Sequence, residues 1–178
     1  MFDFQNGDVI FTAESFSPVS FWVKWLQGDF DYSHVCQYFD GHIYTTGAGG
    51  PLLYRFGTVD PGLYLAGKSY AVKRFQGLTE GQGRMLKAKA ESLIGQRYPI
   101  EKMIRLAILG KTTAGVIKRL GFKPNPWPKN SFCSGTVAMC FQFAGIKLNI
   151  DAEKQEPDAY SPEAVWDEPS LKLVFRKR

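Results

Sequence analysis

A cysteine at a predicted helix start and a histidine in a predicted strand can together support nucleophilic catalysis. Asn130 or Ser131 caps a helix that begins near Cys133 and that Gly145 ends. The dipole and unpaired amides of the first helical turn favour the thiolate over the thiol. His34 lies in an otherwise apolar or aromatic strand, where a buried imidazole needs a partner. Such an imidazole can take the thiol proton and later give it to a leaving group.

A predicted hairpin indicates which histidine meets the thiol. Two strand-like runs, 33–39 and 42–46, flank Asp40-Gly41, the strongest hairpin signal in the chain. In a two-residue turn, directly opposed residues share a sheet face. One face then carries His34, Cys36, Tyr38 and Thr45, and the other carries Val35, Phe39 and His42. We therefore expect the nucleophile helix to pack on the His34 face and His42 to lie at the surface.

The cysteines also admit plainer interpretations. Cys133 can be a small buried apolar residue, Cys36 is a rival thiol on the His34 face, and Cys140 is expected in the core. Three cysteines are too few for a disulfide scaffold and leave at least one thiol free. With two histidines and no CxxC pair, we expect no metal and no cofactor. P-loop and dinucleotide-binding motifs are also absent.

Length and composition predict a single domain over residues 1–178, since 178 residues with 44% hydrophobic content suffice for one core. The net charge of +5 suits an anionic partner without choosing one. The sequence shows neither a signal peptide nor a run long enough to span a membrane, so we expect a soluble, by default cytoplasmic, protein of otherwise unknown localisation.

The pattern of elements predicts an α+β fold, an antiparallel sheet or half-barrel packed against helices. Strand-like runs are expected at 8–11, 52–56, 69–75 and 171–175, and helices at 17–28, 79–95 and 161–166. Residues 99–129 are expected to form a lid-like basic helical insertion. Its span 102–129 has seven basic residues and no acidic one, which fits either a solvated helical face or contact with a membrane surface or anionic polymer.

Several short motifs resemble the NlpC-type papain-like cysteine hydrolases. The run from Ser33 to Gly41 resembles their SHVGIYLGDG strand and turn, and Phe132-Cys133-Ser134-Gly135 resembles their DCSG nucleophile helix. Histidine precedes cysteine here, as in the circularly permuted branch, the YiiX-like amidases. The opening Gly7-Asp8-Val9-Ile10, the run Gly95-Gln96-Arg97-Tyr98 and the closing Ser161-Pro162 also resemble that branch.

The resemblance implies a papain-like fold with Cys133 as nucleophile and His34 as general base, forming an acyl-enzyme on an amide or ester. It places Thr45 where the family has the acid or amide that orients the histidine. Tyr98 and Ser134 fall at the substrate and oxyanion positions, with the Cys133 amide as one oxyanion donor. The sequence departs from the family at Pro99 and Phe132, each of which replaces an acidic residue.

The function expected from these residues is that of a cysteine amidase or peptidase on a cell-wall peptide or lipid-linked substrate. Two alternatives stay open. One is a lipid acyltransferase, although the NCEHF signature of the lecithin retinol acyltransferase relatives is absent. The other is a catalytically weak module that binds lipid or glycan. Nucleic acid is not an expected partner, because the basic residues lie among aliphatic residues and not among aromatic stacking platforms.

Overall fold

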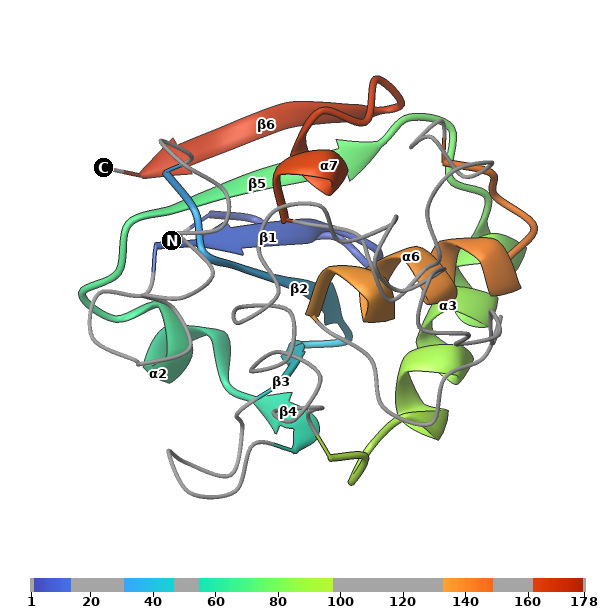
Figure 1. Cartoon of the computed structure of the whole chain (residues 1–178), viewed down its shortest axis with the longest axis horizontal. Coiled ribbons are helices and arrows are strands. Elements are labelled where there is room, and N and C mark those ends of the chain that lie inside the picture. The colour runs from blue at the N-terminus through green and yellow to red at the C-terminus, as the bar shows by residue number, and fades with distance from the viewer. Residues whose placement is uncertain (1, 14–30, 47–54, 98–132, 149–161, 178) are drawn as a thin grey trace, which may run out of the picture.

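One antiparallel sheet organises the part of the chain that the structure describes. A computed structural model describes residues 2–13, 31–46, 55–97, 133–148 and 162–177. Six strands follow the spatial order β4-β3-β2-β1-β5-β6, with β6 beside β5 at one edge (Figure 1). The strands are β1 (Val9–Thr12), β2 (His34–Phe39), β3 (His42–Thr46), β4 (Phe56–Val59), β5 (Tyr70–Phe75) and β6 (Leu171–Lys177). The helices are α2 (Pro61–Leu65), α3 (Glu80–Ser92), α6 (Cys133–Phe143) and α7 (Pro162–Trp166). The predicted α+β class is confirmed.

The hairpin between β2 and β3 has the predicted register. Phe39 pairs with His42 and Tyr38 with Ile43, and the described pairs end at Gln37 with Tyr44. Asp40 has φ of 45° and Gly41 has φ of 82°, the left-handed conformations that a tight two-residue hairpin turn requires. The two-residue turn therefore fixes which side chains of β2 and β3 share a face.

The opening Gly-Asp pair has a structural role at the start of β1. The Asp8 side chain is fully buried and accepts hydrogen bonds from Arg74 Nε at 2.7 Å and Arg74 Nη2 at 2.9 Å. It also accepts from the backbone amide of Gln5 at 2.9 Å. Gly7 has φ of +89°, and a Cβ there would lie 2.6 Å from Leu78 Cδ2. These contacts bind β1 to β5 and hold the central strand in place.

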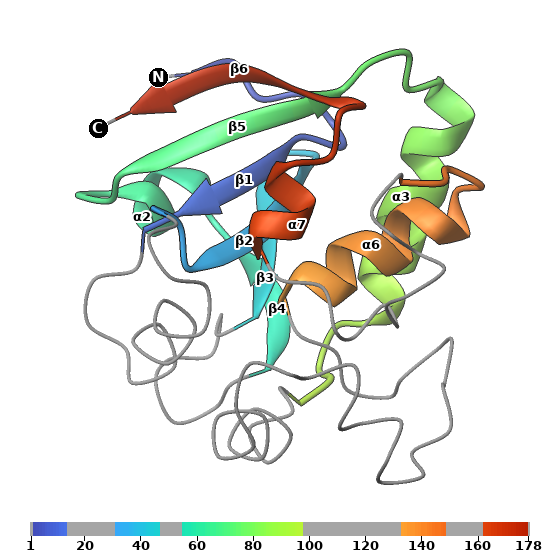
Figure 2. The same cartoon turned by 45° about the horizontal axis from the view of Figure 1, so that its top comes forward.

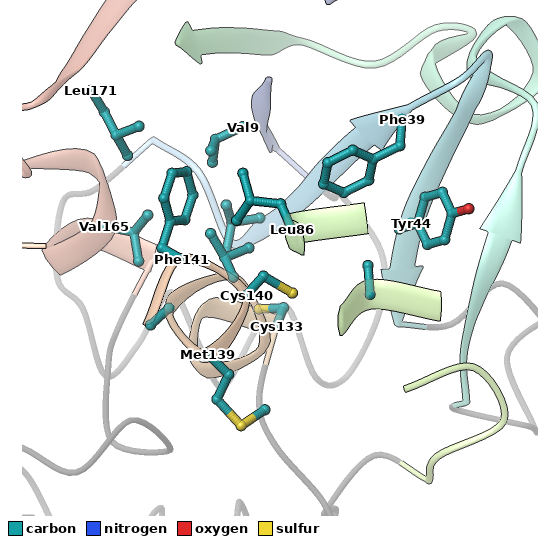
Figure 3. Close-up of a cluster of buried hydrophobic side chains, with 14 of the residues drawn as sticks. Val9, Phe39, Tyr44, Leu86, Cys133, Met139, Cys140, Phe141, Val165 and Leu171 are labelled. Atoms are coloured by element: carbon teal, nitrogen blue, oxygen red, sulfur yellow. The ribbon is translucent and has the colours of Figure 1, made fainter. Parts of the chain in front are cut away.

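The two faces of the sheet carry separate cores. Val9, Val35 and Phe39 face one core, which α3, α6 and α7 cover with residues such as Leu86 and Cys140 (Figure 3). The opposite face carries a smaller cluster of Ile10, Cys36, Ile43, Leu65, Tyr70 and Val72, with Leu65 supplied by α2. Figure 2 shows α3 and α6 side by side, with α2 well separated from them, as in Figure 1. Of the helices that the structure describes, α3, α6 and α7 therefore lie on the Val35 face and α2 on the opposite face.

Most predicted elements are present, with small shifts at their ends. The 79–95 helix appears as α3, begun by a reciprocal capping box between Thr79 and Gln82. Of the predicted strand at 52–56, residues 52–54 lie outside the described residues, and Phe56 begins β4. Helix α2 was not predicted, although Asp60 and Pro61 form a cap and first-turn proline. The predicted helix at 17–28 and the insertion at 99–129 lie outside the described residues. Among the described helices, none has the length and apolarity that crossing a membrane would require.

Candidate active site

Cys133 and His34 come together where α6 and β2 begin. Each is the first residue of its element, and the Cys133 side chain is hydrogen bonded to that of His34. Both residues are buried, with 5% of Cys133 and 8% of His34 exposed. The backbone amides of Val35 and Ser134 also bond the sulfur. The His34 side chain and two backbone amides, one from β2 and one from α6, therefore converge on one sulfur.

These contacts set the ionisation of the thiol. Burial, the largest influence, would raise the pKa of Cys133, because it removes water from the thiolate. The charge and the hydrogen bond of His34 act in the opposite direction, as do the two backbone amides, and together they hold the pKa of Cys133 below its ordinary value. A thiol ionised by a neighbouring imidazole has the electrostatic character of a nucleophile.

Thr45 holds the other side of the imidazole. Its Oγ1 lies 2.7 Å from His34 Nε2, and its side chain is buried with 1% of the residue exposed. The same Oγ1 donates its single proton to the carbonyl of Thr46 at 3.2 Å. It therefore accepts from Nε2–H of His34. Because Nε2 carries this proton, Nδ1 is the nitrogen left to face the Cys133 sulfur and to accept its proton.

The structure corrects the predicted placement of the helix on the sheet. Val137 and Cys140 of α6 pack in the core that includes Val35 and Phe39, which is the face opposite His34. The described pairing of β2 with β3 ends at Gln37, three residues after His34. The thiol and the imidazole therefore meet past the end of that ladder and not across a sheet face. The hairpin argument identified the histidine that contacts Cys133, although it assigned the helix to the wrong face of the sheet.

A tyrosine that the sequence analysis missed extends the chain of polar contacts. Tyr64 lies on α2, and its hydroxyl is 3.4 Å from Thr45 Oγ1. The Nζ of Lys68 lies 3.8 Å from the centre of the Tyr64 ring. The Asp60-Pro61 pair is a helix-start signal that would have revealed α2. The sequence held no signal, however, that this helix packs beneath Thr45.

The other cysteines and the second histidine are placed as expected. Cys140 is fully buried, and burial raises the pKa of its thiol to about 12. Cys36 is 1% exposed, and its Sγ points to the carbonyl of Ile10 at 3.5 Å. His42 is exposed beside the turn, with Nδ1 3.0 Å from the carbonyl of Asp40. Of the predicted oxyanion residues, Ser134 is buried beside the sulfur and Tyr98 lies outside the described residues.

A solved structure resembles the whole chain. Neither a scan against protein families nor a search of curated proteins gives a match. The crystal structure of the metalloprotein YiiX from Escherichia coli O157:H7, DUF1105, matches with a TM-score of 0.64 and 22% identity over 97% of each chain. This chain shares the fold of YiiX. At this identity the likeness to YiiX shows the α+β fold alone, and the chemistry must be argued from the residues themselves.

The description of YiiX as a metalloprotein prompts a test of the residues present here. Across the five described ranges, no group of three or more His, Cys, Asp or Glu side chains is arranged to hold a metal ion. At the candidate site, Cys133 and His34 are joined to each other, and the third member is a threonine hydroxyl. The described site therefore does not fit a metal, and we derive no step through one.

Proposed function

We propose that the protein is a cysteine-dependent hydrolase of the permuted NlpC type that cleaves an amide or ester. The observation that carries the proposal is the contact of the Cys133 thiol with His34, which Thr45 orients from the other side. A nucleophile, a base and a group that orients the base are the arrangement that acyl transfer needs. The pKa of Cys133, which His34 and the two backbone amides hold below its ordinary value, supports the same assignment.

The proposed reaction has two stages. The Cys133 thiolate attacks the carbonyl carbon, and the resulting oxyanion accepts a hydrogen bond from the backbone amide at the start of α6. The C–N or C–O bond then breaks, and the leaving amine or alcohol takes the proton that His34 received from the thiol. Water next attacks the thioester and gives a proton to His34, the C–S bond breaks, and the departing Cys133 thiolate takes that proton back from His34. The acid is released and both groups return to their starting state.

We propose a cell-wall peptide or a lipid-linked molecule as the substrate, which the net charge of +5 would attract if it is anionic. The deciding experiment does not need that substrate. Iodoacetamide labelling of the folded protein, followed peptide by peptide in a mass spectrometer across pH, reports each thiolate separately. We expect Cys133 to react well below the pH at which an ordinary thiol reacts, and Cys140 to stay unlabelled.

An aryl ester probe completes the test. We expect mass spectrometry of the quenched protein to find the acyl group on Cys133 and to find none in Cys133→Ala. Cys36→Ala is the matched control, because it removes the rival buried thiol and should leave acylation intact. Equal labelling of the three cysteines, or an acyl group on Cys36, would contradict the proposal. A module that only binds its ligand would show no acyl-enzyme in the wild type, and it would keep its ligand affinity in Cys133→Ala.

A further inference from the structure

The hydroxyl of Thr45 can act toward His34 either as a hydrogen-bond acceptor or as a hydrogen-bond donor. As an acceptor, Oγ1 takes the proton of Nε2 and leaves Nδ1 free for the thiol. As a donor, it would point its own proton at Nε2 and leave the ring proton on Nδ1, so that Nδ1 could no longer accept from Cys133. A carboxylate in this position has no such choice, because it only accepts. A threonine therefore needs something else to fix its proton.

The contacts of Thr45 supply that constraint. Oγ1 donates to the carbonyl of Thr46 at 3.2 Å and lies 2.7 Å from His34 Nε2. The third neighbour, the Tyr64 hydroxyl at 3.4 Å, meets the remaining lone pair. One proton and two lone pairs are then all used, with Tyr64 as a donor. A hydroxyl placed in this way keeps the Thr45 proton directed away from the imidazole.

The position of Tyr64 is built into α2. Asp60 caps the helix by accepting from the Leu63 amide at 3.0 Å, and Leu65 is buried against the Cys36 and Ile43 cluster. The Tyr64 ring packs against this same cluster. The ammonium group of Lys68 lies 3.8 Å from the ring centre, where a cation withdraws charge from the ring and strengthens the phenol as a donor.

We propose that Tyr64 is a positioning residue that holds Thr45 as the hydrogen-bond acceptor of His34. The inference rests on the proposed function, since it concerns the same thiol and imidazole. Tyr64 does not touch the sulfur. It acts through Thr45 on the tautomer of His34, and Lys68 supports it through the ring. The titratable groups that meet along this chain are Cys133 from α6, His34 from β2, and Tyr64 and Lys68 from α2 and the turn after it.

Tyr64→Phe tests this role because it removes the hydroxyl and keeps the ring packed on the cluster. Thr45 can then turn its proton toward Nε2, which favours neutral His34 and raises the pKa of Cys133. We expect the labelling rate of Cys133 at a pH below its midpoint to fall about 3- to 10-fold, the value of one neutral hydrogen bond. The limiting rate at high pH should stay unchanged. Lys68→Met should shift the midpoint in the same direction by a smaller amount.

Tyr38→Phe is the matched control. It removes a tyrosine hydroxyl from the same sheet face, but that hydroxyl accepts from the Gly41 amide at 3.1 Å, at the other end of the hairpin. Thermal unfolding of each variant shows whether its fold is intact. If Tyr64→Phe labels like the wild type while His34→Ala does not, the role of Tyr64 is wrong and the hydrolase proposal stands. If His34→Ala also labels like the wild type, both proposals fail.

Discussion

The first turn and the interior of helix α6 hold two cysteines with opposite ionisation behaviour. Cys133 and Cys140 lie on the same face of α6, and both are buried in the same core. Burial raises the pKa of both thiols, yet at Cys133 the imidazole and two backbone amides reverse the effect. At Cys140, the distant charge of Lys89 opposes burial only weakly, and the pKa rises to about 12. The comparison shows that the hydrogen-bond partners of a thiol, and not its depth of burial alone, set the direction of its pKa shift.

Removing the imidazole should abolish this difference in the pKa shifts of the two thiols. It should also cause the largest loss of activity. We expect His34→Ala to lower kcat/KM by a factor of about 10³ or more, because removing the base of a catalytic pair removes most of its transition-state stabilisation. The pKa of Cys133 should rise at the same time, because burial then acts without its main opponent. Ester hydrolysis kinetics and iodoacetamide labelling measure the two effects.

His42→Ala is the control for this experiment, since His42 is exposed at the hairpin and faces away from Thr45. It should leave hydrolysis within about twofold of the wild type, as expected of a surface change away from the site. If His42→Ala lost activity and His34→Ala kept it, the contact between α6 and β2 would have no bearing on the chemistry.

The same substitution at the two cysteines of α6 should separate activity from stability. Cys133→Ser should abolish hydrolysis and leave stability nearly unchanged, because a hydroxyl there still meets His34 and the two amides. Cys140→Ser should keep hydrolysis but lower the free energy of unfolding by about 1–3 kcal/mol, because it buries a hydroxyl in an apolar core. Urea unfolding beside activity assays gives both quantities. Equal stability losses at the two sites would mean that their surroundings are alike.

The sequence carried enough information to predict that His34 and Thr45 lie together in the hairpin. The Asp40-Gly41 turn has a strong local signal, and its register alone put His34 and Thr45 on one face, which the structure confirms. The helix boundaries near Cys133 followed from residue types at its ends. Local patterns therefore predicted every element that carries a residue of the proposed pair.

The missing information was the packing between elements. Which face of the sheet α6 covers depends on how the apolar surfaces of Val35 and Phe39 compete with those of Cys36 and Ile43, and period-two patterns do not rank the two faces. Tyr64 was missed for the same reason, because a five-residue helix has little periodicity and its contact with Thr45 is tertiary.

Removing the hydrogen bond between Thr45 and His34 should lower activity less than removing the imidazole ring does. Thr45→Val keeps the shape of the side chain but leaves Nε2–H of His34 without its acceptor. We expect kcat/KM to fall about tenfold, and the pKa of Cys133 to rise, since a buried donor without a partner costs about 1–3 kcal/mol. Thr45→Asn offers an amide oxygen as acceptor and should recover part of the loss. An unchanged pH profile in Thr45→Val would show that the 2.7 Å contact does not orient the ring.

The buried thiol of Cys140 should make the stability of the fold sensitive to alkaline pH. A thiol whose pKa rises from 9.0 to about 12 on folding keeps its proton in the native state while the unfolded chain loses it. Stability from Cys140 is therefore fully present below pH 9 and declines as the pH rises toward 12. At pH 9.5 the wild type should have lost on the order of 1 kcal/mol relative to Cys140→Ala, both compared with their stability at neutral pH. Urea unfolding of the two proteins at both pH values measures the difference. Cys133 contributes no such decline, because folding lowers its pKa below the ordinary value. If the wild type and Cys140→Ala lost stability in parallel, a group other than Cys140 would cause the alkaline sensitivity.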